Sequence, residues 1–443
     1  MTSTDPARQQ QLVFRASLAL ALVFAGAAVV VPAGLGWDFA NFYDTGRRAA
    51  RGLLGSIYSP ETAIGSESPQ GKMAFWGAPI SAWFYAPLSV FRPKIALILL
   101  KLVGTIAYAG GLVLLYREAR PTSERNGGTR AWFSAAFLVL VLLYQPFWTM
   151  YRVGGQTTPI VFLLLVVGLW AYLRDRMVAV AVCMLFVVLM KPAFAFVPAF
   201  LVLFSGWRYF GALVAAFAIT GLASVALFGW PLHAEFLDIL RRGSGKPSPW
   251  PFNSSLYIIA DAFRPVANSV PVPRAGGWFP DALRIGLKIL VLGTFVRLMV
   301  RSRRESWTQE QRRLFGYLMA ISFCLLISQV VWEHYLAVLF IPLAFLLAVL
   351  PSMDRAARVH LGVLVALAVL QNLVLVLFFR DHVLLTSTPA LLLVSLVKAG
   401  PLLAYLAFLW LHEDVVFRLV TSSAPIPARP AGGPASFAAG AVA

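Results

Sequence analysis

The sequence predicts an all-α membrane protein that crosses a lipid bilayer many times. Of its 443 residues, 59% are hydrophobic and only 13% are charged, and the mean hydropathy is +0.77. An average soluble domain contains about 25% charged residues, so this chain has too few charges to cover a water-soluble globule of its size. The composition therefore excludes a soluble enzyme, a disordered chain and a coiled coil.

About twelve apolar runs are the predicted membrane spans, because about 20 apolar residues cross a bilayer. They cover residues 12–33, 95–116, 131–149, 159–173, 177–190, 193–206, 209–229, 282–300, 314–331, 335–350, 359–378 and 389–411. The stretch 159–206 allows either three short helices or two longer ones, since only the charged segment 174–176 interrupts it before Lys191. We expect one membrane domain over 1–411 and a cytoplasmic tail over 412–443 that lacks the apolar content to fold.

The net charge of +18 indicates membrane orientation rather than nucleic-acid binding. The basic residues stand in short clusters between apolar runs, and such clusters mark the cytoplasmic loops of membrane proteins. With the N-terminus in the cytoplasm, the basic loops fall inside and the long segments 34–92 and 230–281 fall outside. The two cysteines lie within apolar runs, which indicates neither a disulfide nor a metal site. The first run lacks a clear cleavage site and is predicted to be a retained span.

The first outer segment begins with a predicted amphipathic helix that contains Asp38. From Gly36 to about Leu54, a period of 3.6 residues places several polar side chains near one face and most aromatic ones elsewhere. Such a helix is typical of an interfacial anchor. A carboxylate in the first turn, in aromatic surroundings, is also suited to general-base catalysis. Asp38 is therefore the candidate base, and Asp44 of the same segment is the alternative.

Further polar residues fall on the same predicted outer side. Lys191, just before Pro192, is either a lysine that snorkels to the interface or a cation that holds a phosphate. Glu333 and His334 form either a polar turn or a site where His334 binds a phosphate oxygen and Glu333 sets its protonation. Three more candidates share this side, namely Arg152, Gln156 and Asn253. Polar groups at this depth are costly, so their gathering predicts a site at the outer membrane surface.

These short motifs, taken in order, resemble glycosyltransferase family 87. The motifs are Asp38-Phe39 with Tyr43, Gly52 and Tyr58-Ser59-Pro60, then Phe84-Tyr85-Ala86-Pro87-Leu88, Gly155-Gln156, Lys191-Pro192, Asn253-Ser254-Ser255-Leu256 and Trp332-Glu333-His334. Members of the family are similar to polyprenyl-phosphate-mannose-dependent α-mannosyltransferases with a GT-C fold. Two features depart from the pattern: Thr157-Thr158 follows where an Asn is common, and the aromatic loop around Trp76 has no close match.

The resemblance implies an inverting, metal-independent sugar transfer at the outer face of the cytoplasmic membrane. A sugar, with mannose expected first, would pass from a polyprenyl-phosphate donor to a hydroxyl of a glycan or glycolipid acceptor, without a cofactor. Asp38 would be the general base, and Lys191, His334 and Arg152 would stabilise the departing phosphate. The residues that would contact substrate are Gln156, Asn253, Glu333, Tyr43 and Trp332.

Three alternatives remain at the level of sequence. The same reaction could use another lipid-linked sugar, such as arabinose, glucose or galacturonic acid. A lipid or sugar transporter would instead carry internal repeats and ionisable groups near the bilayer midplane; the halves show no obvious repeat, and Lys101 alone lies well inside a run. A structural scaffold would tolerate changes at Asp38.

Overall fold

The computed structural model describes most of the chain and confirms a helical membrane protein. The described residues are 6–30, 37–58, 75–153, 155–244, 253–264, 266–267, 270–271, 277–379 and 388–423. Among them, three helical stretches are long and apolar enough to cross a membrane, namely Pro93–Arg125, Pro192–Phe228 and Leu391–Leu411. Shorter apolar helices accompany them. The total of about twelve spans stays a prediction.

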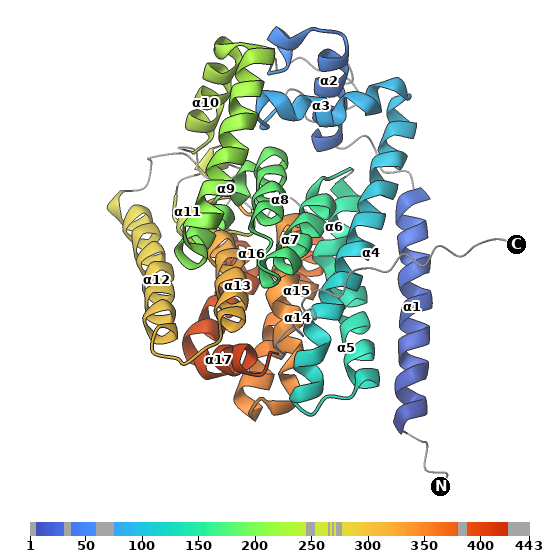
Figure 1. Ribbon diagram of the computed structural model, residues 1–443, viewed down its shortest axis with the longest axis vertical. Helices are drawn as coiled ribbons and strands as arrows, with labels where there is room; N and C mark the ends of the chain where they lie inside the picture. The colour runs from blue at the N-terminus through green and yellow to red at the C-terminus, as the bar shows by residue number, and fades with distance from the viewer. Residues whose placement is uncertain are drawn as a thin grey trace, which may run out of the picture.

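The predicted apolar runs fall on helices of the bundle, although the runs 193–206 and 209–229 share one helix and the run 335–350 begins in a 3₁₀ segment (Figure 1). The long helices are α1 (Pro6–Val30), α4 (Pro93–Arg125), α5 (Arg130–Leu143), α7 (Thr158–Leu173), α8 (Met177–Met190), α9 (Phe196–Phe228), α12 (Trp278–Ser302), α13 (Gln309–Ile327), α15 (Arg355–Phe379) and α16 (Thr388–Leu411). Shorter helices complete the bundle, namely α6 (Gln145–Val153), α14 (Phe340–Ala348) and α17 (Glu413–Thr421), with the 3₁₀ segments η4 (Pro192–Ala195), η5 (Glu333–Leu339) and η6 (Leu350–Ser352).

The stretch 159–206 is three short helices, the first of the two predicted arrangements. Helices α7 and α8 are separate, and α9 bends at Gly206, whose φ of 67° is non-helical. Glycine adopts this left-handed region without steric cost. The first part of α9 therefore forms a third short helix before the bend.

Smaller elements gather at the end of the molecule away from the start of α1 (Figure 1). This end carries α2 (Trp37–Ala50), α3 (Ala82–Tyr85) and α10 (Trp230–Ser244), together with η1 (Leu54–Ser56), η2 (Pro79–Ser81) and η3 (Ala86–Val90). Between this end and α12 lie α11 (Ile258–Asp261) and a two-stranded antiparallel ribbon of β1 (Val266–Ala267) and β2 (Val270–Pro271), in which Val266 pairs with Pro271. Parts of both predicted outer segments lie outside the described residues.

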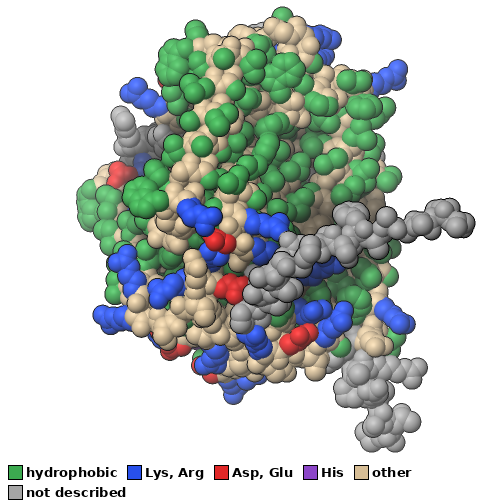
Figure 2. Space-filling view, in the orientation of Figure 1, with side chains coloured by type: hydrophobic (Ala, Val, Ile, Leu, Met, Phe, Trp, Pro, Cys, Tyr) green, Lys and Arg blue, Asp and Glu red, His purple; other side chains and the backbone are tan. Residues whose placement is uncertain are grey.

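The centre of the bundle is formed by α7, α13, η5 and α14. Every residue of α14 is buried, and α7 packs against α4 on one side and α8 on the other. In Figure 2, most Lys and Arg side chains on the visible face lie in the lower half, toward the end that holds α17, and hydrophobic side chains cover much of the rest. On this face the basic side chains therefore gather at the end opposite α2 and α3 (Figures 1 and 2).

The first part of the tail is folded, contrary to the expectation for 412–443. Helix α17 buries the apolar side chains of Val415, Val416 and Phe417 against α13 and α14. Its first residue, Glu413, is held by two arginines of α12, with Arg301 Nη1 at 2.6 Å. An apolar residue at every helical turn suffices for packing, so nine residues fold where the overall composition is poor in apolar groups. Residues 424–443 lie outside the described part of the chain.

Helix α2 is more deeply packed than the predicted interfacial helix. The ring of Phe42 stacks on Tyr85 of α3 with centroids 4.6 Å apart. The backbone carbonyl of Tyr85 meets Gly46 so closely that a Cβ at this position has no room. Asn41 and Thr45, on the predicted polar face, are buried. Helix α2 is therefore a rigid part of the fold, and this holds Asp38 in a defined place.

Candidate functional site

Three polar side chains from three distant segments form a connected chain at the end of the bundle that carries α2. The amide nitrogen of Gln156 donates to Asp38 Oδ2 in the first turn of α2. The amide oxygen of Gln156 accepts a hydrogen bond from Lys191 Nζ at 3.0 Å. We call this set the Asp38–Gln156–Lys191 relay. It joins the carboxylate of Asp38 to the ammonium of Lys191 through one neutral carboxamide.

The turn that carries Gln156 depends on the glycine before it. Gly155 has a φ of +65°, a conformation that glycine adopts readily. A Cβ at this position would lie 3.0 Å from Phe39 Cβ and 2.8 Å from Leu97 Cδ1. The missing side chain thus allows the turn to approach α2 and α4 closely enough for Gln156 to reach Asp38.

Lys191 owes its place to the proline that follows it. A residue before proline is disfavoured in the helical region, and Lys191 leaves α8 with φ −144° and ψ 86°. Its Nζ lies 5.1 Å from the centre of the Tyr335 ring and 5.9 Å from that of Phe42, within the range of cation–π attraction. The end of α8 before η4 therefore places the Lys191 ammonium between the rings of Phe42 and Tyr335.

Burial changes the acidity of this lysine, which lies between α8 and the next apolar helix. Desolvation lowers the pKa of Lys191 to about 8, against a smaller opposing effect of the Asp38 charge. The side chain is only 7% exposed. A poorly solvated ammonium attracts an anion more strongly than a hydrated one does, so this position suits a phosphate.

His334 lies beside Lys191 with an unused ring nitrogen. The residue is buried, and its ring packs edge-on against Tyr335, with centroids 4.8 Å apart. Its Nε2 makes no hydrogen bond within the described part of the chain. A buried polar atom without a partner is costly. Nε2 is therefore available either to accept a hydrogen bond from a ligand or water or to donate one to it.

Asp44, the alternative base, has different surroundings. Its carboxylate lies 3.4 Å from Arg47 Nη2 and 3.9 Å from Arg48 Nη2, both on α2 itself. The Asp44 carboxylate is therefore engaged by two arginines of its own helix, whereas the Asp38 carboxylate is joined to Gln156. The geometry therefore favours Asp38 over Asp44 as the candidate base.

Asn253 is tied to the protein backbone rather than to the relay. Its Oδ1 accepts from the backbone amides of Ser255 at 2.9 Å and Val331 at 2.8 Å, and its Nδ2 donates to the carbonyl of Gln329 at 3.0 Å. Both ends of the carboxamide are thus occupied. The predicted substrate contact of Asn253 stays untested, and the structure gives this side chain the task of holding the segment before η5.

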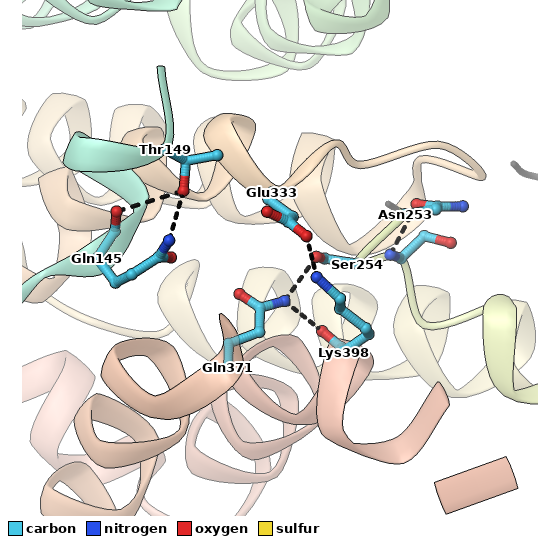
Figure 3. Close-up of polar contacts among 8 residues, drawn as sticks. Gln145, Thr149, Asn253, Ser254, Glu333, Gln371 and Lys398 are labelled. Atoms are coloured by element: carbon cyan, nitrogen blue, oxygen red, sulfur yellow. Dashed lines mark hydrogen bonds and ion pairs between the residues drawn. The ribbon is translucent and has the colours of Figure 1, made fainter. Parts of the chain in front are cut away.

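Glu333 pairs with a residue that the sequence analysis did not single out. Its Oε1 accepts from the ammonium of Lys398 on α16, and Gln371 of α15 donates to the carbonyl of Lys398 at 2.9 Å (Figure 3). We call this the Glu333–Lys398 pair. Lys398 lies in the middle of the apolar run 389–411, so the expectation that Lys101 alone lies well inside a run is wrong. The signal that could have found it is that a lysine within a span needs an acid partner, and this chain has only 19 acidic residues.

The remaining predicted site residues are less informative. The hydroxyl of Tyr43 donates to the backbone carbonyl of Phe91 at 2.8 Å, which fastens α2 to the segment after η3. Trp332 is half-buried and forms an isolated β-bridge with Asn253. Arg152 belongs to α6, but its side chain lies outside the described residues. Within the described residues, no cluster of three His, Cys, Asp or Glu could hold a metal ion.

Comparison with known proteins identifies the family of the chain. The model of Glycosyltransferase family 87 matches residues 75–328, which is more than half of the sequence. The matched region includes Gln156 and Lys191, whereas Asp38, Glu333 and His334 fall outside it. The comparison with curated proteins found no match.

Proposed function

The chain belongs to glycosyltransferase family 87, and on this basis we propose that it transfers a sugar from a polyprenyl-phosphate donor to an acceptor hydroxyl. The family and the apolar helices make it a membrane glycosyltransferase. Mannose is the sugar that we propose first, and a glycan or glycolipid is the proposed acceptor. The observation that carries the proposal is the Asp38–Gln156–Lys191 relay, because it holds a carboxylate and an ammonium near each other without letting them pair directly.

The separation of the two charges matters for the chemistry. A direct ion pair would neutralise both groups and leave neither ready for substrate. The carboxamide of Gln156 keeps Asp38 and Lys191 apart. Asp38 accepts one hydrogen bond from its nitrogen, and Lys191 donates one to its oxygen. A substrate that enters between them can therefore meet a base on one side and a cation on the other.

The proposed reaction uses these groups on opposite sides of the sugar. Asp38 accepts the proton of the acceptor hydroxyl, and the oxygen attacks the anomeric carbon from the face opposite the phosphate. The bond between that carbon and the phosphate oxygen breaks, and the phosphate leaves with the electron pair. Attack from the opposite face inverts the anomeric configuration.

The developing charge on the phosphate needs stabilisation. Lys191 supplies a positive charge, and the free Nε2 of His334 supplies a hydrogen bond. Groups that are already oriented toward a developing anion contribute about 3–4 kcal/mol each to catalysis in measured cases. Neither group requires a bound metal ion or a cofactor, and we propose that none is used.

Orientation in the membrane follows from charge. The relay lies at the end with α2 and α3, away from the end where Lys and Arg gather (Figures 1 and 2). Cytoplasmic loops carry the excess of Lys and Arg. We therefore propose that the site faces the non-cytoplasmic side of the cytoplasmic membrane, where a lipid-linked sugar can serve as an activated donor without a nucleotide.

The experiment that tests this function is a transfer assay with purified protein. Polyprenyl phosphates that carry radiolabelled mannose, glucose, arabinose or galacturonic acid are offered with a lipid and glycan extract of the source membranes. We expect transfer from one of these donors, release of one polyprenyl phosphate for each sugar transferred, and inversion in the product. Transfer from nucleotide sugars but from no lipid-linked donor would contradict the proposal.

A further inference from the structure

The Glu333–Lys398 pair is buried within the membrane bundle next to the relay. The side chain of Lys398 is fully buried, and that of Glu333 is 5% exposed. Lys398 belongs to α16, in one of the three stretches that are long and apolar enough to cross a membrane. Charged residues in such helices are costly and commonly mark functional positions.

Stability alone does not account for this pair. Replacement of a buried ion pair by apolar residues of similar size is often neutral or stabilising. Loss of only one partner is strongly destabilising, because the other charge is left buried. A pair of this kind therefore acts best as a device that fixes geometry, and what matters is which segments it fixes.

The segments in question are α16 and the start of η5. Glu333 is followed directly by His334 and Tyr335. The ring of Tyr335 lies 5.1 Å from Lys191 Nζ, and the imidazole of His334 packs edge-on against that ring. The backbone amide of Tyr335 donates to the carbonyl of Trp332 at 2.7 Å, which makes this turn tight. A shift of the Glu333 carboxylate would consequently move the imidazole and the phenol ring beside Lys191.

Two further contacts keep Lys398 in place. Gln371 Nε2 donates both to the backbone carbonyl of Lys398 and to Ser254 Oγ at 2.6 Å, as Figure 3 shows. The backbone amide of Ser254 donates to the carbonyl of Val331 at 2.6 Å. Helices α15 and α16 are thus connected to the segment 331–333 in two ways, through Ser254 to Val331 and through Lys398 to Glu333.

From these contacts we infer that Lys398 is a positioning residue for the transfer reaction. It acts through Glu333, and it holds His334 and Tyr335 against Lys191 at the place where the donor phosphate departs. This inference rests on the proposed function, because it assigns the device to the phosphate end of that site.

The test compares four variants with the wild type. Glu333→Gln combined with Lys398→Met removes both charges, whereas Glu333→Lys combined with Lys398→Glu reverses the pair. Lys398→Arg keeps the charge. Lys101→Met is the matched control, because Lys101 is another buried lysine of a membrane helix but lies on α4. Turnover at saturating donor, donor KM, the unfolding temperature in detergent and binding of a polyprenyl phosphate are measured.

We expect the neutral double variant to unfold at the wild-type temperature or above and to lose turnover by about tenfold or more, with a smaller change in donor KM. The reversed pair should have much higher turnover than the neutral variant, and Lys398→Arg should keep a large part of the wild-type turnover. Lys101→Met should keep the wild-type turnover. Wild-type turnover in the neutral variant would overturn the inference, as would no recovery in folded reversed and Lys398→Arg variants. If the neutral double variant failed to fold while the other variants folded, the pair would be a stability element, and this result would also overturn the inference.

The two proposals fail in different ways. A wild-type protein that neither transfers a lipid-linked sugar nor binds polyprenyl phosphate contradicts the proposed function, and the inference with it. An active wild type with an equally active neutral double variant contradicts the inference alone.

Discussion

Two polar clusters lie near the start of η5, and their charges are arranged in opposite ways. In the Glu333–Lys398 pair the acid and the base contact each other directly. In the Asp38–Gln156–Lys191 relay a neutral carboxamide stands between them. A direct pair satisfies itself and holds its surroundings, whereas separated charges keep their capacity for a substrate. This difference is the reason why we propose that the relay takes part in the chemistry and that the pair holds its surroundings in place.

The largest expected effect is at Asp38. Asp38→Asn keeps the size and the hydrogen bonding of the side chain but removes the base, so turnover should fall by about 100-fold or more, as expected for loss of general-base catalysis. The measurement is the initial rate of transfer from the active donor. Asp44→Asn is the matched control on the same helix and should keep most of the activity per folded molecule. Similar losses in both variants would remove the distinction between them.

Gln156 tests whether the spacer itself matters. Gln156→Ala removes the carboxamide, so Asp38 and Lys191 are freed to approach one another and to neutralise each other. Turnover should fall by about 10- to 100-fold, in the range of a lost positioning group. The rate is compared with that of Thr157→Ala, a change at the neighbouring residue of the same turn. An unchanged rate in Gln156→Ala would show that the spacing of the charges has no part in catalysis.

The pH dependence follows from the lowered pKa of Lys191. Because this pKa is about 8, the ammonium is present below that pH and is lost above it. The kcat/KM for the donor reports the unliganded enzyme and should decline above about pH 8, while a bound phosphate favours the charged lysine and shifts the decline of kcat to higher pH. Lys191→Arg stays charged and should not show this decline. A flat profile for the wild type would contradict the assignment.

The smallest expected effect on chemistry is at Asn253. Asn253→Ala removes three hydrogen bonds that hold the segment before η5, so it should lower the free energy of unfolding by about 1–3 kcal/mol. Donor KM should change little. Thermal unfolding in detergent and donor titration check the two parts. A large rise in donor KM without loss of stability would contradict this expectation and support Asn253 as a substrate contact.

The sequence was sufficient for features that repeat along the chain. Apolar runs of helical length predicted the helices, because such runs are a local pattern of composition. The orientation in the membrane, inferred from the basic loops, stays a prediction. Lys191 was identified as a candidate because Pro192 follows it and the preceding helix was expected to end there. Gln156 was found from a short motif, yet its contact with Asp38 joins residues 118 positions apart, which no local pattern shows.

Other features depend on partners that the sequence does not place together. Lys398 looked like part of an apolar span, because its acid partner lies 65 residues away. The backbone partners of Asn253 were equally hidden from the sequence, because two of them come from the segment 329–331. Helix α17 depends on a narrow apolar face that the composition of the whole tail conceals.

The most direct test of the central claim is the affinity for a polyprenyl phosphate, the departing group of the proposed reaction. It is measured for the wild type, Asp38→Asn and Lys191→Met under the same conditions. If the relay divides its work between base and cation, Asp38→Asn binds as tightly as the wild type or more tightly, because a negative charge is lost. Lys191→Met then binds about tenfold more weakly or worse, since a partly buried charge partner is worth more than about 1.4 kcal/mol. Equal binding by Lys191→Met and the wild type, or weaker binding by Asp38→Asn, would contradict the account.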